Sequence, residues 1–253
     1  INNYALGENE YRLVPDGLIS QRPIDELVRH LKKLDVKIEV NNNEYWLKIQ
    51  GPLHKKTETI EVDCSKTTQI ASALLMVLSK LNIELEVKNI KSSQTYFELT
   101  KYLIEQFKNN QTEFTIPVDF SSASYPIALA AITGECIIDN CKKIDSYQSD
   151  SIFVELLNNS GAEIKIDNSG LIVKQSKTLT PIDIDCSPCP DLVPALAFVC
   201  SYISGTSYLR NLSVLRFKES DRVEEIIKVL TKFNVEFELD LKSDTLIING
   251  SNN

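Results

Sequence analysis

Short alternating segments and longer apolar segments follow one another along the chain in a recurring order. A strand-like stretch ends at an aspartate that has a serine two positions later, and this pair begins at Asp63, Asp119 and Asp185. Each pair leads into an apolar segment of helical length, then a strand-like stretch, a second amphipathic helix and a short alternating strand. The pattern predicts strand, helix, strand, helix, strand three times over, which is an α/β fold built from repeated βαβαβ units.

The expected elements can be given by residue range. The apolar helices are expected at 67–81, 122–132 and 190–203. Strands are expected at 60–65, 118–121 and 182–187, before these helices, and at 112–116, 162–166 and 235–239, where the units end. A half unit precedes the first repeat, with a helix at 22–34 and strands at 37–40 and 45–49.

The distribution of apolar residues around the helices predicts how the units pack. Helices at 67–81 and 122–132 are apolar nearly all round, so they must be buried on several sides, whereas their amphipathic partners need only one covered face. We therefore expect helices inside and sheets outside, in two domains at 1–117 and 118–253 that meet near Pro117. Because the chain opens in the middle of a repeat, we expect it to belong to a longer protein.

Composition and charge remove several classes of function. A net charge of −8 argues against a general nucleic-acid binder, but it leaves room for a small anionic substrate held by a few local cations. The apolar runs are too short for a membrane span and the start does not resemble a secretory signal, so we expect a cytoplasmic protein. The six cysteines are interpreted as core residues, and only two histidines are present, so no metal site is expected.

The charged segment 215–222 is the most pointed candidate for chemistry. Lys218, Glu219 and Arg222 precede an amphipathic helix, and cations at a helix start oppose the macrodipole unless an anion binds there. The alternative is a solvated face, in which Asp221 and Glu224 form an N-terminal capping pattern. The local sequence alone favours the solvated face.

Polar residues also open the apolar helices. Thr67, Thr68 and Gln69 stand before the first, and Asp191 follows Pro190 before the third. Hydroxyls and carboxylates at helix starts are usually caps, but a carboxylate before an entirely apolar helix can also serve as a general base. No nucleotide-binding glycine motif and no nucleophile elbow accompanies them.

Five motifs in order make the chain resemble a known family. They are Arg22-Pro23-Ile24, Thr67-Thr68-Gln69 with 72–76, the serine-rich run 121–125, Pro190-Asp191, and the run 218–222. Together they resemble the 3-phosphoshikimate 1-carboxyvinyltransferase (EPSP synthase) family over about residues 22 to 236. The resemblance implies an inside-out α/β fold of two domains, each made of βαβαββ units, of which this chain would be part.

The resemblance also implies a reaction and its residues. The family transfers the enolpyruvyl group of phosphoenolpyruvate to the 5-hydroxyl of shikimate 3-phosphate and releases phosphate, by addition and then elimination, without a cofactor. By carry-over, Asp191 takes the hydroxyl proton and Glu219 acts in proton transfer at carbon 3. The carried-over ligands of phosphoenolpyruvate are Arg22 and Arg222, and those of shikimate 3-phosphate are Thr67, Thr68, Ser93, Tyr96 and Lys218, with Gln69 touching both.

Departures from the family pattern and two rival interpretations accompany the resemblance. Val214 stands where many members have an asparagine, and the family's other Lys-Ser, Arg and Lys motifs have no counterpart here. The rivals are a UDP-sugar enolpyruvyl transferase, whose reactive cysteine is absent from 16–21, and a non-catalytic binding fragment. The expected partners are the two small substrates, with no nucleic acid and no membrane, and the full-length protein is expected to be a monomer.

Overall fold

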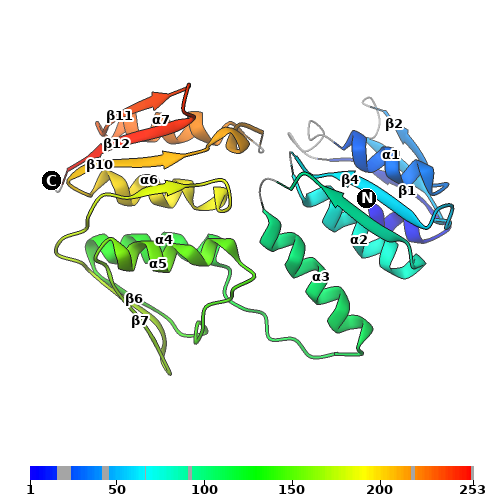
Figure 1. Ribbon diagram of the computed structural model, residues 1–253, viewed down its shortest axis with the longest axis horizontal. Coiled ribbons are helices and arrows are strands. Elements are labelled where there is room, and N and C mark those ends of the chain that lie inside the picture. The colour runs from blue at the N-terminus through cyan, green and yellow to red at the C-terminus, as the bar shows by residue number, and fades with distance from the viewer. Residues whose placement is uncertain (16–23, 42–45, 66, 91–92, 218–219, 252–253) are drawn as a thin grey trace. The chain divides into compact units, whose positions relative to one another are not determined.

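A computed structural model describes residues 1–15, 24–41, 46–65, 67–90, 93–217 and 220–251. The chain divides into two compact units, Ile1–Thr112 and Glu113–Asn253. The sequence places this division near Pro117, five residues later. Each unit is described by itself, with the element labels of Figure 1.

The first unit combines an antiparallel sheet and a parallel strand pair with three α-helices. The sheet has the order β1-β3-β2, and the parallel pair is β4-β5. The strands are β1 (Glu10–Leu13), β2 (Lys37–Val40), β3 (Leu47–Gln50), β4 (Thr59–Asp63) and β5 (Glu84–Lys88). The helices are η1 (Asn2–Leu6), α1 (Asp25–Lys33), α2 (Gln69–Leu81) and α3 (Gln94–Lys108).

Alternation along the strands directs one face of each sheet into the core of this unit. In β4, Ile60 and Val62 are buried while Glu61 is exposed, as a period of two requires. Leu74 and Leu78 of α2 are completely buried in the same cluster. The predicted helix at 22–34 is confirmed for its described part as α1, whose His30 is 2% exposed.

The second unit contains two of the predicted repeats. Its elements before residue 175 are α4 (Phe120–Thr133), β6 (Glu135–Ile138), η3 (Ser149–Ser151), α5 (Ile152–Asn159), β7 (Glu163–Asp167) and β8 (Gly170–Lys174). Those after it are β9 (Asp183–Asp185), η4 (Pro190–Leu192), α6 (Val193–Ser201), β10 (Gly205–Arg210), η5 (Ser213–Phe217), α7 (Arg222–Lys232), β11 (Glu236–Asp240) and β12 (Thr245–Gly250). The sheets have the orders β6-β8-β7 and β11-β12-β10-β9, and β9 and β10 run parallel.

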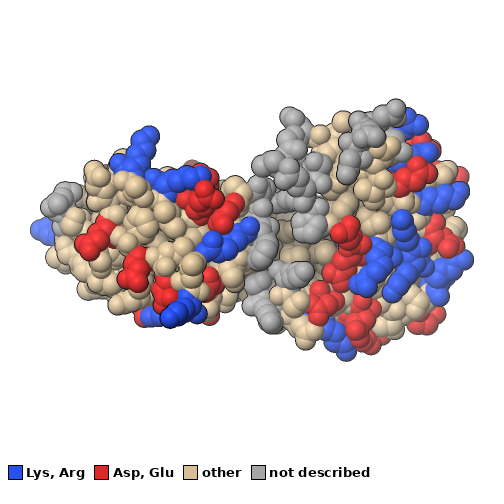
Figure 2. Space-filling model, turned by 90° about the horizontal axis from the view of Figure 1, so that it is seen from above, with Lys and Arg blue, Asp and Glu red and all other residues tan. Residues whose placement is uncertain are grey.

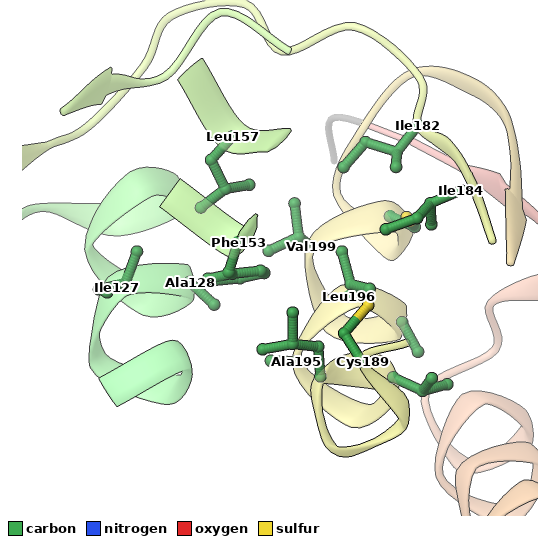
Figure 3. Close-up of a cluster of buried hydrophobic side chains, with 14 of the residues drawn as sticks. Ile127, Ala128, Phe153, Leu157, Ile182, Ile184, Cys189, Ala195, Leu196 and Val199 are labelled. Atoms are coloured by element: carbon green, nitrogen blue, oxygen red, sulfur yellow. The ribbon is translucent and has the colours of Figure 1, made fainter. Parts of the chain in front are cut away.

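The helices that are apolar all round lie in the interior of this unit, as predicted. Figure 3 shows Ala128 of α4 and Leu196 of α6 in one cluster, with Phe153 of α5 and Ile184 of β9 beside them. At about 25 cal/mol per Å² of buried apolar surface, such contacts dominate the stability of the unit. The structure therefore confirms the α/β fold of repeated units with helices packed between sheets (Figure 1).

The repeated aspartate has the same structural role in all three copies. A side-chain oxygen of Asp63, Asp119 and Asp185 accepts a hydrogen bond from the backbone N–H of the serine two residues later, at 2.9, 3.0 and 2.8 Å. These Asx turns redirect the chain from an extended stretch into a helix. The repeat found in the sequence is therefore a repeated turn.

Two predicted strands are absent from the described residues. Residues 112–116 and 118–119 are irregular, and α4 already begins at Phe120 with Asp119 as its N-cap. At 118–121 a side chain takes the place of a neighbouring strand: Gln148 donates to the carbonyl of Val118 at 2.7 Å and accepts from the N–H of Phe120 at 2.9 Å. His30 lies in a helix whose charged residues suggest a surface position, but α1 packs that side chain into the core.

Candidate active site

The polar residues predicted for the first unit lie at the starts of two adjacent helices. Thr68, the N-cap of α2, is buried and donates its hydroxyl to the carbonyl of Ser93, the N-cap of α3, at 3.1 Å. Thr67 accepts from the N–H of Gln69 at 3.2 Å. Tyr96 follows in the first turn of α3 and is half-buried. The fold thus gathers the five residues at one pair of helix ends.

The backbone at Ser93 shows why this arrangement depends on a local interaction. Ser93 has φ +56° and ψ 28°, a left-handed conformation that is uncommon for serine. The hydrogen bond from Thr68 holds its carbonyl in place, so the two helix starts support each other. The N-cap residue Thr68 makes no side-chain cap hydrogen bond and instead joins two helices, while Thr67 accepts from the N–H of the first residue of α2.

In the second unit, Asp191 and Arg222 lie in one groove of about 1260 Å³. Its walls come from α4, α6 and α7 and from strands β11 and β12. Much of its lining is apolar, including Phe198, Val229 and Phe233, while Ser121 and Ser122 contribute hydroxyls. A mostly apolar concavity with a few polar groups is the usual form of a small-molecule site.

Asp191 and Arg222 form a direct ion pair. Nη1 of Arg222 donates to Oδ1 of Asp191 at 2.5 Å, and each side chain is about one third exposed. Neither η4 nor α6 has a side-chain hydrogen bond from its N-cap residue. Asp191 is therefore not a helix cap, and its carboxylate faces a cation beside the groove.

The predicted capping pattern at the start of α7 is confirmed. Asp221 is the N-cap and accepts from the N–H of Glu224 at 3.1 Å, and it also binds Arg216 at 3.3 Å. Arg222, the first residue of the helix, points instead to Asp191. The two interpretations of this segment thus apply to different residues: the aspartate is a cap, and the arginine belongs to the groove.

Several predicted residues stay outside this description. Arg22, Lys218 and Glu219 lie outside the described residues. Val214 is half-buried and packs against the core of the second unit, so it presents no polar group there.

The cysteines are free thiols of the interior. All but Cys136 are buried. Burial raises the pKa of Cys200 to about 12, so this thiol stays protonated and acts as a small core side chain. Among the described residues, no group of His, Cys, Asp and Glu side chains is arranged to hold a metal ion.

The sequence analysis missed two polar residues behind the groove, Gln148 and Asp150. Both are buried, and Asp150 binds the hydroxyl of Ser121, which lines the groove. The available signal was a glutamine and an aspartate immediately before the apolar helix α5.

Charged side chains of both signs share the face of the molecule seen from above (Figure 2). On the face seen in Figure 2, acidic and basic side chains are interspersed over the described residues. Among these residues, no helix is long and apolar enough to span a bilayer.

Comparison with known proteins identifies the relationship. The model of the family described as EPSP synthase (3-phosphoshikimate 1-carboxyvinyltransferase) matches residues 3–253. The chain belongs to the EPSP synthase family. The resemblance seen in the sequence is thereby confirmed.

Individual relatives agree with this assignment. The 3-phosphoshikimate 1-carboxyvinyltransferase of Pyrococcus abyssi is 31% identical over 249 residues, covering 92% of this chain and 59% of the relative. That of Thermococcus kodakarensis is 32% identical, covering 86% and 56%. The chain thus spans about 60% of the length of these curated relatives.

Solved structures confirm the fold. EPSP synthase from Acinetobacter baumannii superposes with a TM-score of 0.66 at 17% identity, covering all of this chain and 62% of that one. The enolpyruvyl transferase NikO from Streptomyces tendae gives a TM-score of 0.62 at 13% identity, covering 95% and 60%. The partial enolpyruvyl transferase fold is therefore established for this chain.

Proposed function

We propose that the protein to which this chain belongs transfers the enolpyruvyl group of phosphoenolpyruvate to the 5-hydroxyl of shikimate 3-phosphate and releases phosphate. The observation that carries the proposal is the Asp191–Arg222 pair in a groove of about 1260 Å³, within a chain of the EPSP synthase family. It supplies one acceptor for a proton and one cation for an anionic substrate. A UDP-sugar acceptor is not favoured, because the named relatives are 3-phosphoshikimate 1-carboxyvinyltransferases.

Arg222 acts on phosphoenolpyruvate. A guanidinium presents a planar fork of donors that matches a carboxylate or a phosphate. In the structure this fork contacts Asp191, so the binding of phosphoenolpyruvate substitutes a substrate anion for a protein anion. The family motif gives the same role to Arg22.

Asp191 is the general base. Once Arg222 contacts the substrate, the carboxylate of Asp191 can accept the proton of the 5-hydroxyl while that oxygen adds to carbon 2 of phosphoenolpyruvate. In the same addition carbon 3 gains a proton by way of Glu219, which gives a tetrahedral ketal. Loss of phosphate and of a proton from carbon 3 then restores the vinyl group, so atoms and charges balance without a cofactor.

The helix starts of the first unit bind shikimate 3-phosphate. Hydroxyls and backbone N–H groups at a helix start favour the binding of a phosphate. Both can donate hydrogen bonds to it, and the positive end of the helix dipole lies there. Thr67 and Ser93 provide hydroxyls, and Thr68, whose hydroxyl donates to the carbonyl of Ser93, provides its backbone N–H. Tyr96 packs against the ring, and Gln69 contacts both substrates. Lys218 completes the phosphate site.

Phosphate release and substrate binding together test this function. We expect shikimate 3-phosphate to bind in a calorimetric titration, more tightly when phosphoenolpyruvate is present, and phosphate to be released. Asp191→Asn and Glu219→Gln should slow release by about 100-fold or more, the usual contribution of an acid or base. Glu224→Gln, an exposed carboxylate that pairs with Lys228, is the control and should behave as the wild type. No binding of shikimate 3-phosphate, or unchanged release in both variants, would refute the proposal.

The remaining expectations for the whole protein follow from this function. We place it in the cytoplasm as a monomer, with the two domains assigned at 1–117 and 118–253. Size measurement of the purified protein by light scattering tests the monomeric state.

A further inference from the structure

Asp150 is a buried carboxylate that the proposed chemistry does not use. It lies in the turn η3, and its side chain is completely buried, unlike that of any other Asp or Glu in the part of the chain that the structure describes. A buried carboxylate is costly unless hydrogen bonds or neighbouring dipoles stabilise it. The contacts of Asp150 and its neighbours therefore indicate which part of the structure this carboxylate holds in place.

The segment around Asp150 holds the start of α4. Asp150 accepts a hydrogen bond from the hydroxyl of Ser121. Two residues earlier, Gln148 binds the carbonyl of Val118 at 2.7 Å and the N–H of Phe120 at 2.9 Å. Two buried side chains thus fix the backbone on one side of Ser121 and the hydroxyl of Ser121 itself.

The same carboxylate lies close to the element that carries Asp191. Burial, followed by the charge of Asp150, raises the pKa of Cys189 to about 12. Cys189 is the N-cap of η4, and Asp191 is in η4. Asp150 is therefore placed behind the wall of the groove where α4 and η4 begin, while Ser121, Asp191 and Arg222 line that groove.

We propose that Asp150 is a positioning residue, which holds the Ser121 hydroxyl as a hydrogen-bond acceptor for a substrate hydroxyl. An ionised carboxylate only accepts, so Ser121 must spend its single hydrogen on Asp150. The hydroxyl of Ser121 can then only accept hydrogen bonds from a ligand in the groove. It can bind a ligand hydroxyl, which donates, but not a phosphate oxygen, which accepts. Together with the carboxylate of Asp191, which lines the same groove, this hydroxyl gives the groove acceptors suited to a ring that carries hydroxyls. The inference rests on the proposed function, and it adds the group that recognises the hydroxylated substrate.

Steady-state kinetics with both substrates test the position of the hydroxyl. Ser121→Ala should raise the KM for shikimate 3-phosphate about tenfold and leave the KM for phosphoenolpyruvate within about twofold, the effect of one lost hydrogen bond to a substrate. Asp150→Ala should also raise the KM for shikimate 3-phosphate. The double variant should have a KM no higher than that of the more impaired single variant, because both changes remove the same interaction.

Ser243→Ala is the matched control. Its hydroxyl also donates to a carboxylate, Asp240, at 2.7 Å, but Ser243 is exposed in the turn between β11 and β12 and does not line the groove. We expect both KM values to stay at the wild-type level. Additive effects in the double variant, equal changes in both KM values, or the same change in Ser243→Ala would overturn the inference.

A spectroscopic readout separates this inference from the proposed function and from a failure to fold. In carbon-13 NMR at about pH 7, the carboxyl carbon of Asp150 should have the chemical shift of an ionised group and should move in Ser121→Ala but not in Ser243→Ala. A protonated Asp150 would donate to Ser121 and contradict the inference. If the wild type fails to bind shikimate 3-phosphate, the proposed function is refuted. An ionised Asp150 whose signal responds to Ser121→Ala would then show the contact between the two side chains, but the role of that contact in binding this substrate would be refuted as well.

Discussion

The ion pair between Asp191 and Arg222 makes a quantitative prediction for anion binding. In the structure, Asp191, the proposed base, pairs at 2.5 Å with Arg222, the cation proposed to bind phosphoenolpyruvate. Any anion that binds Arg222 must therefore compete with Asp191. We predict that Asp191→Asn, which keeps the shape of the side chain but removes its charge, binds inorganic phosphate more tightly than the wild type.

The size of this effect follows from the exposure of the pair. Two unit charges about 4 Å apart interact by about 1 kcal/mol in bulk water and about 4 kcal/mol at an effective dielectric constant of 20. Because each side chain is about one third exposed, solvent screening brings the competition to about 1–2 kcal/mol. That corresponds to a roughly 5- to 30-fold lower Kd for phosphate.

Calorimetric titration with inorganic phosphate at low and high ionic strength is the assay. The gain in affinity should shrink at about 0.5 M salt, since screening weakens a partly exposed pair. Glu224→Gln removes a negative charge from the same helix and should leave the Kd within about twofold. An unchanged or higher Kd in Asp191→Asn would refute the idea that this aspartate competes with anions.

Three further predictions concern stability, measured by urea unfolding. Thr68→Ala should lose about 1–2 kcal/mol because the carbonyl of Ser93 loses its donor, while Thr68→Ser should restore most of it; equal losses in both variants would contradict this role. Burial, followed by the charges of neighbouring cations, lowers the pKa of His30 from 6.5 in the folded protein. The contribution of His30 to stability should therefore be constant above about pH 6.5 and fall as the pH drops below it, because the unfolded chain then binds the proton more readily. The same pH dependence in His30→Gln would exclude this cause. Gly170→Ala should cost at least about 2 kcal/mol, because φ is +121° and a Cβ would lie 2.2 Å from the carbonyl oxygen of Ile138. Gly134→Ala, with open space around the new Cβ, should cost less than about 1 kcal/mol. Similar losses in the two variants would contradict strain in Gly170→Ala.

The regular part of the fold was predictable because local patterns determine it. Alternation identified β4, and an apolar surface nearly all round identified α4 as an interior helix. The same pattern in α2 was expected to bury several sides, but α2 buries one stripe, made of Ala71, Leu74, Val77 and Leu78. The repeated aspartate marked each strand-to-helix turn. These features depend on residues close together in the sequence, which a single chain displays directly.

The failures came from long-range contacts. Residues 118–121 are predicted as a strand, but a strand needs a partner, and the side chain of Gln148 takes that place beside Val118 and Phe120. Residues 112–116 also alternate, but they pair with no strand among the described residues. The burial of His30 likewise follows from what α1 packs against and not from the pattern of α1. Helix capping at Asp221 was predictable, whereas the pairing of Arg222 with Asp191 joins positions 31 residues apart.

A titration of shikimate 3-phosphate with and without phosphoenolpyruvate tests most directly the proposal that the protein binds both substrates and that Arg222 acts on phosphoenolpyruvate. We predict that phosphoenolpyruvate tightens the binding of shikimate 3-phosphate about tenfold or more, in line with usual coupling energies, and that Arg222→Gln abolishes this tightening while shikimate 3-phosphate still binds. Identical binding of shikimate 3-phosphate with and without phosphoenolpyruvate in the wild type, or equal tightening in Arg222→Gln, would contradict it.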